Sequence, residues 1–202
     1  MARKRVVLAV SGASGAGIAL RIGKLLGRMP GVDVHLVVSE AAERTLTHEV
    51  GPHALRDLES AATMRHSIRD IGATIASGSF RTAGMIVAPC SMRTTAAIAA
   101  GLSDNLLTRA ADVHLKERRR LVLVVRESPL HLGHLRAMTA VTEYGAIVAP
   151  AVPAFYQAPE TTADIVDQIA RRAIDLLSLD RPVLSAAWEG LHNGANGALE
   201  PD

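Results

Sequence analysis

The residues best suited to chemistry follow a short apolar run near the middle of the chain. Met85–Ala88 has the character of a buried strand, and Pro89 is expected to end it because proline has no N–H to donate to a sheet. Ser91 and Thr94 then open a helix that is expected to continue to Ala100. A strand that stops in a short polar turn before a helix presents free backbone N–H groups and the positive end of the helix dipole. We therefore expect an anion site here, most often one for phosphate.

Charged side chains that follow this helix could act on the same anion. Arg109 and Lys116, together with Asn105 and Asp112, are spaced by four, three and four residues, so they share one face of an expected helix that ends near Arg118. Charged faces of this kind are commonly solvated and pair their charges internally. The spacing therefore leaves open whether Arg109 or Lys116 meets a ligand.

Arg126 and Glu127 directly follow another apolar run, Leu121–Val125. Ligands of an open parallel sheet bind beyond the carboxyl ends of its strands, so this pair is expected at the ligand edge. At that edge an arginine suits an anion and a glutamate suits proton transfer, although the two residues could instead form a structural ion pair.

Three other residues with reactive side chains are expected to take no part in the chemistry. His131 and His134 lie three residues apart, which could suit a metal ion, but no further ligand accompanies them and we expect no metal site. Cys90 is the only cysteine, and it is expected to be a buried packing residue rather than a nucleophile. A single cysteine also excludes an internal disulfide framework.

Strands and helices are expected to alternate along the chain, with no hairpin signal between them. This pattern predicts a doubly wound α/β domain of three layers, Rossmann-like or flavodoxin-like, with a mostly parallel sheet. The domain is expected to span residues 1–178 and to be followed by a tail over 179–202, where the composition turns to Gly, Asn, Ala and Pro. No role follows from the sequence for residues 50–80. Besides the central strand, the expected strands are Arg5–Val10, Val32–Val38, Leu121–Val125 and Ala146–Ala149.

The turn after the first strand, Ser11–Gly17, is built from small residues that allow a tight bend and a close approach to a ligand. Its glycines at positions 12, 15 and 17 miss the spacing of a dinucleotide loop. The two serines favour a mononucleotide phosphate, and a purely structural turn is the alternative. Ser39 is expected to cap a helix through about His48 and could also face the pocket, whereas Glu49 by itself looks like a solvated carboxylate.

Aromatic residues make up only 2% of the chain, so their positions are informative. Phe155 and Tyr156 share a loop, Pro150–Pro159, that several prolines stiffen. This loop is expected to be a lid over an apolar group, although its rings could simply plug the end of the sheet. Trp188 lies in the expected tail and suggests a surface against which it packs.

Length and charge exclude several classes of protein. The 202 residues fit one domain, and the net charge of +2 argues against a dedicated nucleic-acid binder. No apolar run approaches the roughly 18 residues that a membrane span needs. The basic N-terminus precedes a run too short for a signal peptide, so we expect a cytoplasmic protein.

Blocks along residues 5–178 resemble, in order, the UbiX-type flavin prenyltransferases. The Ala76–Arg81 block is most similar to the branch that accompanies bacterial phenolic and aromatic acid decarboxylases. The blocks are Gly12–Gly15, Ala76–Arg81, Pro89–Thr94, Asp104–Asn105, Arg109–Val113, Leu115–Arg118, Leu121–Val124, Arg126–Leu130 and Pro153–Tyr156.

The resemblance implies an enzyme that binds reduced FMN and dimethylallyl phosphate. It would join the five-carbon group to N5 and C6 of the flavin, forming a fourth ring, and prenylated FMN would then pass to a UbiD-type decarboxylase. The resemblance also implies a homododecamer without a metal ion.

By matching position, the resemblance implies a role for each of three sets of residues. The donor phosphate would be held by Arg109, Lys116, Tyr156 and Arg172, with Arg109 and Lys116 also stabilising its departure. Protons would be handled by Ser14, Glu49 and Glu127. The basic side chains of Arg109, Lys116 and Arg172 are therefore expected to converge at one edge of the sheet beside the flavin. FMN would be held by Gly12, Ala13, Ser14, Ser39, Ser91, Met92, Arg93, Thr94 and Arg126.

The resemblance has departures, and two other functions compete with it. Val125 stands where the family usually has proline, and Arg136–Ala137 replaces a usual Glu-Asn. One rival is an FMN-dependent cysteine decarboxylase, similar to the phosphopantothenoylcysteine enzyme, but Pro89–Arg93 differs from the Pro-Ala-Ser-Ala-Asn block of that group. The other is a non-catalytic FMN-binding subunit of an aromatic acid decarboxylase, against which the full set of cations and carboxylates argues.

Overall fold

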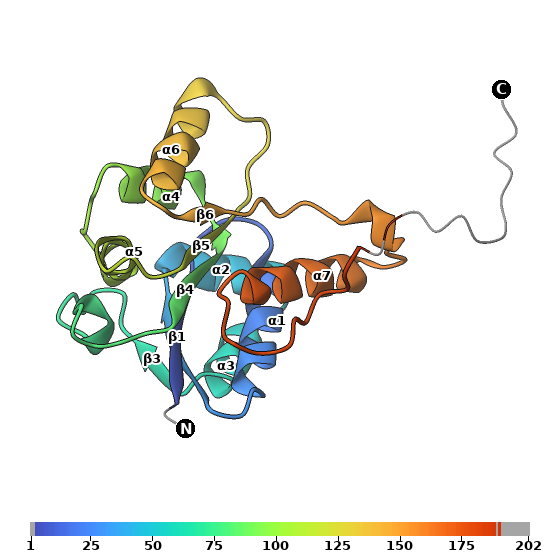
Figure 1. Cartoon of the computed structure of the whole chain (residues 1–202), viewed down its shortest axis with the longest axis horizontal. Coiled ribbons are helices and arrows are strands. Elements are labelled where there is room, and N and C mark those ends of the chain that lie inside the picture. The colour runs from blue at the N-terminus through green and yellow to red at the C-terminus, as the bar shows by residue number, and fades with distance from the viewer. Residues whose placement is uncertain (1–2, 189, 191–202) are drawn as a thin grey trace, which may run out of the picture.

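The computed structural model describes residues 3–188 and 190, and its centre is a parallel sheet with helices on both faces (Figure 1). The strands lie in the order β3-β2-β1-β4-β5-β6, and each neighbouring pair is parallel. This is the Rossmann order, and without the three-residue β3 it is the flavodoxin order, so the expected doubly wound α/β fold is confirmed. The strands are β1 Lys4–Val10, β2 Val32–Val38, β3 Met64–His66, β4 Gly84–Cys90, β5 Leu121–Val125 and β6 Ile147–Val148.

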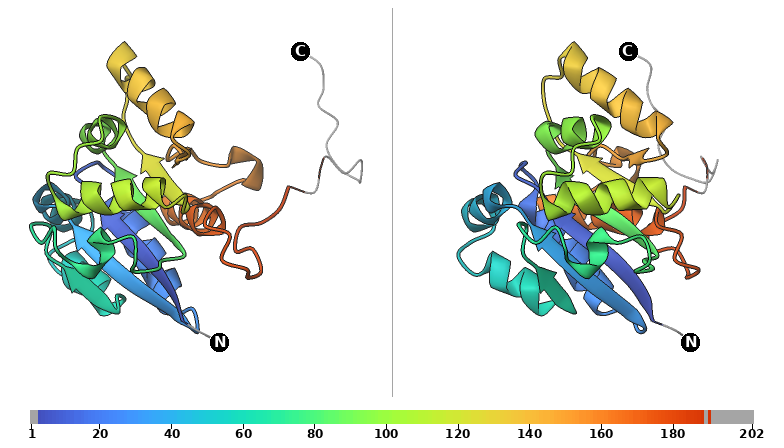
Figure 2. Two further views of the ribbon diagram at one scale, coloured as in Figure 1. Left: turned by 60° about the vertical axis from the view of Figure 1, so that its left-hand side comes forward. Right: turned by 90° about the vertical axis from the view of Figure 1, so that its left-hand side faces the viewer.

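The helices pack against the two faces of the sheet through two hydrophobic cores. Successive residues of β1 point to opposite faces, so Val6 and Leu8 pack on the side of α1 and α7, and Val7 and Ala9 on the side of α5. Figure 2 shows α5, in lime green, and α7, in orange-red, on opposite sides of the sheet. The helices are α1 Ala16–Gly27, α2 Glu40–Glu49, α3 Ala54–Ser60, α4 Met92–Ala99, α5 Leu106–Lys116, α6 Leu132–Glu143 and α7 Thr162–Asp175, with short 3₁₀ turns η1 Thr74–Ala76 and η2 Phe155–Gln157.

The sheet differs from the sequence expectation at two places. Pro89 does not end the central strand, because β4 continues to Cys90. The register between β4 and β5 shifts between Val87 and Cys90, so the missing N–H of proline falls where the ladder is irregular. Residues 50–80 contain the edge strand β3. Met64 and Arg65 of this strand are exposed, so the strand needs no apolar run and none marks it in the sequence.

The chain after α7 folds back onto the domain as far as the structure describes it. Leu179 is buried, and the carboxylate of Asp175 accepts hydrogen bonds from the N–H groups of Leu184 and Ser185, both at 2.8 Å. The expected tail is described only to Trp188 and at Gly190, so the boundary at residue 178 stays a prediction. Over residues 3–188 and 190, no helix is long and apolar enough to cross a membrane.

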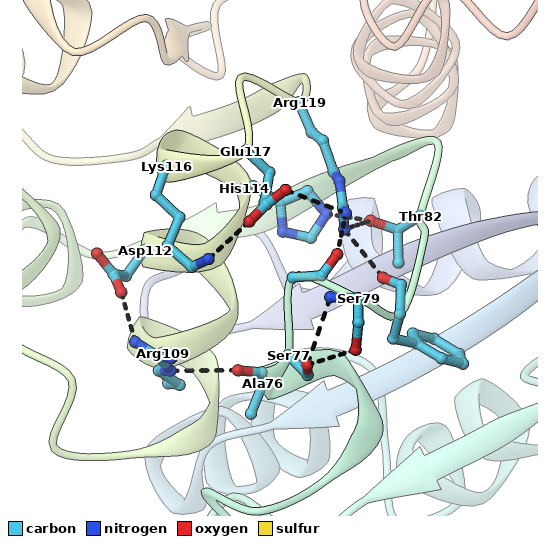
Figure 3. Close-up of polar contacts among 12 residues, drawn as sticks. Ala76, Ser77, Ser79, Thr82, Arg109, Asp112, His114, Lys116, Glu117 and Arg119 are labelled. Atoms are coloured by element: carbon cyan, nitrogen blue, oxygen red, sulfur yellow. Dashed lines mark hydrogen bonds and ion pairs between the residues drawn. The ribbon is translucent and has the colours of Figure 1, made fainter.

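A buried histidine ties α5 to the chain before β4. His114 is fully buried, and its Nδ1 lies 2.7 Å from the carbonyl oxygen of Ala110. Its Nε2 lies 2.8 Å from Oγ1 of Thr82 (Figure 3). In the neutral ring Nδ1–H donates to Ala110, and Nε2 accepts from the hydroxyl of Thr82. Burial, which disfavours the charged ring, lowers the pKa of His114 to about 4.

Stability should therefore fall in mild acid. The unfolded chain binds a proton at His114 near pH 6.5, whereas the folded chain does so only near pH 4, so this residue should remove about 3 kcal/mol of the free energy of unfolding as the pH falls through that range. Denaturant unfolding at a series of pH values measures the loss. His114→Gln, which is neutral throughout, should lose less stability over this range, while His35 and His66, whose pKa values burial also lowers, keep part of the slope. An equally steep profile in that variant would contradict the prediction.

Candidate active site

The site begins where the sheet reverses its winding, between β1 and β4. The helix after β1 packs on one face and the helix after β4 on the other. In open α/β sheets, ligands bind beyond the carboxyl ends of the strands at such a point. The turns at that edge are bonded to each other. Oγ of Ser11 accepts from the N–H of Ser91 at 2.8 Å and donates to the carbonyl of Pro89 at 3.0 Å. The two predicted anion-binding turns therefore form one surface.

Glu49 occupies the start of α1. Its Oε2 accepts hydrogen bonds from the N–H groups of Gly15 at 2.9 Å and Ala16 at 2.8 Å. An internal carboxylate therefore takes the place where the sequence indicated a phosphate on this turn. Burial raises the pKa of Glu49, but hydrogen bonds from Ala16, Gly15 and the Ser14 side chain, with the positive charge of Arg126, outweigh burial and bring it below its usual range. Glu49 is therefore ionised and lies within the electrostatic reach of Arg126.

Close packing of the first turn against α2 accounts for Gly12. A Cβ at this position would collide with the Cβ of Ala41 and lie 3.2 Å from its carbonyl carbon. Ser39 begins α2 directly before this contact, and its hydroxyl accepts from the N–H of Ala42 at 3.2 Å, as expected for a cap. The glycine thus lets the turn and the capped end of α2 lie against each other at this edge of the sheet.

Gly12→Ala should therefore lower stability by about 1–3 kcal/mol and weaken flavin binding, because α2 must move away from the turn. Thermal unfolding and flavin titration measure the two effects. Gly17→Ala is the matched control, since a Cβ there would lie 3.9 Å from Val166 in ordinary contact. Equal stability and equal flavin affinity in the two variants would show that the contact at residue 12 does not matter.

The turn after β4 presents fewer side chains than the sequence suggested. Ser91 caps α4, with its Oγ accepting from the N–H of Thr94 at 3.3 Å. Met92 and Thr94 are only 3% and 4% exposed, so they could offer a ligand little besides backbone groups. Arg93 is exposed and forms an ion pair of 3.1 Å with Asp104. Cys90 is fully buried, and burial raises the pKa of its thiol to about 12, so the thiol stays protonated.

Arg126 and Glu127 lie at the carboxyl end of β5, as expected, and both are exposed. The N–H of Arg126 donates to the carbonyl of Cys90 at 3.2 Å, which places Arg126 beside the turn after β4. Oε1 of Glu127 accepts from the N–H of Ser128 at 3.2 Å. Further along, His131 caps α6, with its Nδ1 accepting from Gly133 at 3.0 Å, and no cluster of metal-ligating side chains occurs among the described residues.

Two of the predicted cations lie together on α5 (Figure 3). Arg109 donates through Nη1 to Asp112 at 2.7 Å and through Nε to the carbonyl of Ala76 at 3.2 Å. Lys116 forms an ion pair of 2.6 Å with Glu117. Asn105 is the cap of α5, with its side-chain oxygen 3.1 Å from the N–H of Thr108, and is not a member of the charged helix face as the spacing indicated.

The other two residues predicted to bind the prenyl donor are Tyr156 in η2 and Arg172 on α7, and they lie around one hollow. A hollow of about 430 Å³ is lined by the aromatic loop, by α7 and by the chain up to Trp188. The rings of Tyr156 and Trp188 meet edge to face with 5.2 Å between their centroids, and Arg172 also lines the hollow. Gln168 lines it too, and its buried Oε1 has no hydrogen-bond partner among the described residues. Trp188, which sequence reasoning could not place, therefore belongs to the same surface as Tyr156.

The expected convergence of Arg109, Lys116 and Arg172 does not occur within one chain. The first two lie on α5 and the third on α7, and the sheet separates these helices (Figure 2). The cause is the winding of the fold, because α5 covers one face of the sheet while α7 packs beside α1 on the other. A single chain thus presents the residues predicted to bind the prenyl donor in two separate groups, one on α5 and one around α7.

Comparison with known proteins places these observations in context. Residues 1–174 match the family model described as Flavoprotein. Flavin prenyltransferase UbiX of Thauera aromatica is 52% identical over 186 residues, which are 92% of this chain and 94% of that protein. The structure of a dodecameric FMN-dependent UbiX-like decarboxylase from Escherichia coli O157:H7 matches with a TM-score of 0.86 at 45% identity, over 92% of this chain and all of that one. AnUbiX (PadA1), solved with FMN and dimethylallyl pyrophosphate, matches with a TM-score of 0.86 at 44% identity over 93% and 98% of the two chains.

Proposed function

This chain belongs to the flavoprotein family and is a flavin prenyltransferase of the UbiX type, and from that premise we propose how its residues carry out the transfer. The reaction moves the dimethylallyl group of dimethylallyl phosphate to N5 and C6 of reduced FMN. The observation that carries the proposal is the single polar surface that the turns after β1 and β4 form, with Arg126 beside it. The product, prenylated FMN, is the cofactor of a UbiD-type decarboxylase.

The residues at the switch point fit FMN. An anionic phosphate and a flat ring need hydroxyl and N–H donors, a cation and a close backbone approach. The chain supplies Ser39 and Ser91 as hydroxyls, Arg126 as a cation, and a first turn of small residues that Gly12 lets pack against Ala41. FMN would supply the nucleophilic atoms of the reaction. With the rest of the two turns, the residues proposed to hold it are Gly12, Ala13, Ser14, Ser39, Ser91, Met92, Arg93, Thr94 and Arg126.

The donor is proposed to meet both groups of cations. Arg109 and Lys116 stabilise the negative charge that develops on the departing phosphate, and Glu127 protonates it. Arg172 and Tyr156 hold the donor from the other side, with the apolar hollow beside Trp188 excluding water from the five-carbon group. Glu49, ionised and bonded to Ser14, takes up a proton that the flavin loses.

We propose that the site is completed between subunits of a homododecamer. The two groups of donor residues lie on opposite faces of one chain and cannot hold the same phosphate. Packing two copies so that α5 of one meets α7 of the next would bring them together. The dodecameric relative at 45% identity supports such an assembly.

Anaerobic incubation of the purified protein with reduced FMN and dimethylallyl phosphate tests the function. Mass spectrometry of the flavin should show a gain equal to one five-carbon prenyl unit. Release of CO₂ from a cysteine-containing substrate would instead support the cysteine decarboxylase, and neither result would indicate a flavin carrier.

Three further assignments belong to the same proposal. Delivery of the product to a UbiD-type decarboxylase follows from the chemistry of prenylated FMN, and a cytoplasmic location suits the single, reduced Cys90. A flavoprotein domain over residues 1–178 accords with the family match over 1–174. Co-purification with a decarboxylase produced in the same cells would test the delivery.

A further inference from the structure

Glu117 carries a charge that does not suit its position at the C-terminal end of α5. It follows the last residue of α5 and forms the cap of that helix. The C-terminal end of a helix carries partial negative charge and favours cations, so a carboxylate there does not stabilise α5. Its close partner is Lys116, with 2.6 Å between Nζ and Oε1.

The loop before β4 closes over this ion pair. A Cβ on Gly78 would lie 2.7 Å from Cδ of Glu117 and 2.9 Å from Nζ of Lys116, so the ends of these two side chains would have to shift if residue 78 were larger. Arg119 fixes the loop by donating to the carbonyl oxygens of Gly78 and Phe80, the latter at 2.9 Å (Figure 3). The loop therefore lies directly against the ion pair, whose two side chains stay partly exposed.

Glu117 stands between two cations. Its Oε1 meets Lys116, and its Oε2 lies 3.8 Å from Nη2 of Arg119, whose side chain is only 14% exposed. If another anion took Lys116, the carboxylate could remain beside Arg119 without leaving an unpaired charge. Because Arg119 is a second partner, little free energy is lost when Glu117 gives up Lys116 to another anion.

We propose that Glu117 is an exchangeable counter-ion that occupies Lys116 until a phosphate displaces it. The inference rests on the proposed role of Lys116 in holding the donor phosphate. Before the donor binds, Glu117 neutralises Lys116, and after the prenyl group has left it competes with inorganic phosphate for the same ammonium group. It thereby weakens phosphate binding and promotes release of the phosphate product.

Phosphate titration of the assembled, FMN-loaded protein tests this role, because bound FMN already fills the flavin phosphate site. Calorimetry with inorganic phosphate should show Glu117→Gln binding about two- to fivefold more tightly than the unmodified protein, a gain typical of a partly exposed ion pair. The gain should shrink toward one as salt screens the charges, which a purely structural effect would not do.

A matched control and a third variant separate the possible outcomes. Glu59→Gln removes a glutamate of similar exposure, 32% against 35%, that pairs with Arg65 away from the site, and it should leave phosphate affinity unchanged. Lys116→Ala should lose phosphate affinity. If it does while Glu117→Gln binds no more tightly, the counter-ion role is wrong and the proposed function stands. If Lys116→Ala binds phosphate normally, the donor site at Lys116 is wrong, and the counter-ion role fails with it.

Discussion

Two inactive variants, Arg109→Ala and Arg172→Ala, should recover activity when their subunits are assembled together. Each variant alone should lose about 10²-fold or more in prenyl transfer, because one cation aimed at the departing phosphate is missing. If the two arginines of a site come from different chains, random mixing leaves roughly a quarter of the sites with both, so transfer should return to about that fraction. Single-turnover transfer in co-expressed mixtures measures the recovery.

The matched control uses two variants on the same helix. Arg109 and Lys116 both lie on α5 of one chain. In a mixture of Arg109→Ala and Lys116→Ala every α5 therefore lacks one of the two cations, so the mixture should stay inactive. Native mass spectrometry can establish that mixed assemblies have formed. Inactive mixtures of Arg109→Ala with Arg172→Ala would then refute a site shared between subunits.

Glu49→Gln should reduce turnover by about 10²- to 10⁴-fold while flavin still binds, because the amide cannot accept the proton. Its amide oxygen can still accept the hydrogen bonds from Gly15 and Ala16, so the start of α1 should keep its geometry. Steady-state kinetics and flavin titration check the two halves of this expectation. Turnover within a few-fold of the unmodified protein would show that Glu49 only caps the helix.

The pH dependence gives a second view of Glu49. The N–H groups at the start of α1 and the charge of Arg126 hold its pKa below the usual glutamate range despite burial. Because the ionised form is the active one, the acid limb of the turnover profile that belongs to this residue should lie below the ordinary glutamate value. Glu49→Asp, whose shorter side chain cannot keep both hydrogen bonds, should move that limb toward higher pH.

Local patterns in the sequence were enough to predict the class of fold and many of its boundaries. Continuous apolar runs mark buried parallel strands, so Val32–Val38 and Leu121–Val125 agree with β2 and β5 residue for residue. Hydroxyl residues before helical patterns mark helix starts: Ser39 accepts the bond predicted of a cap, and Ser91 caps the helix that it was expected to open. Both signals depend on residues within a few positions of one another.

Features that depend on distant residues were outside the reach of these patterns. Glu49 looked like a solvated carboxylate because its partners at Gly15 and Ala16 lie more than thirty positions earlier. The closure of Gly78 over Glu117 was likewise hidden, since a glycine in a polar stretch shows no sign of what it approaches.

By itself, the sequence determined the alternation of strands and helices, the chemistry available at their ends and the family resemblance. Only the tertiary structure decided which of those groups meet. It joined the turns of Ser11 and Ser91 into one surface, and it placed Arg109 and Arg172 on opposite faces of the sheet. The physical reason is that spacing along a chain reports the face of a single helix or strand, whereas the winding of the sheet decides on which side each helix packs.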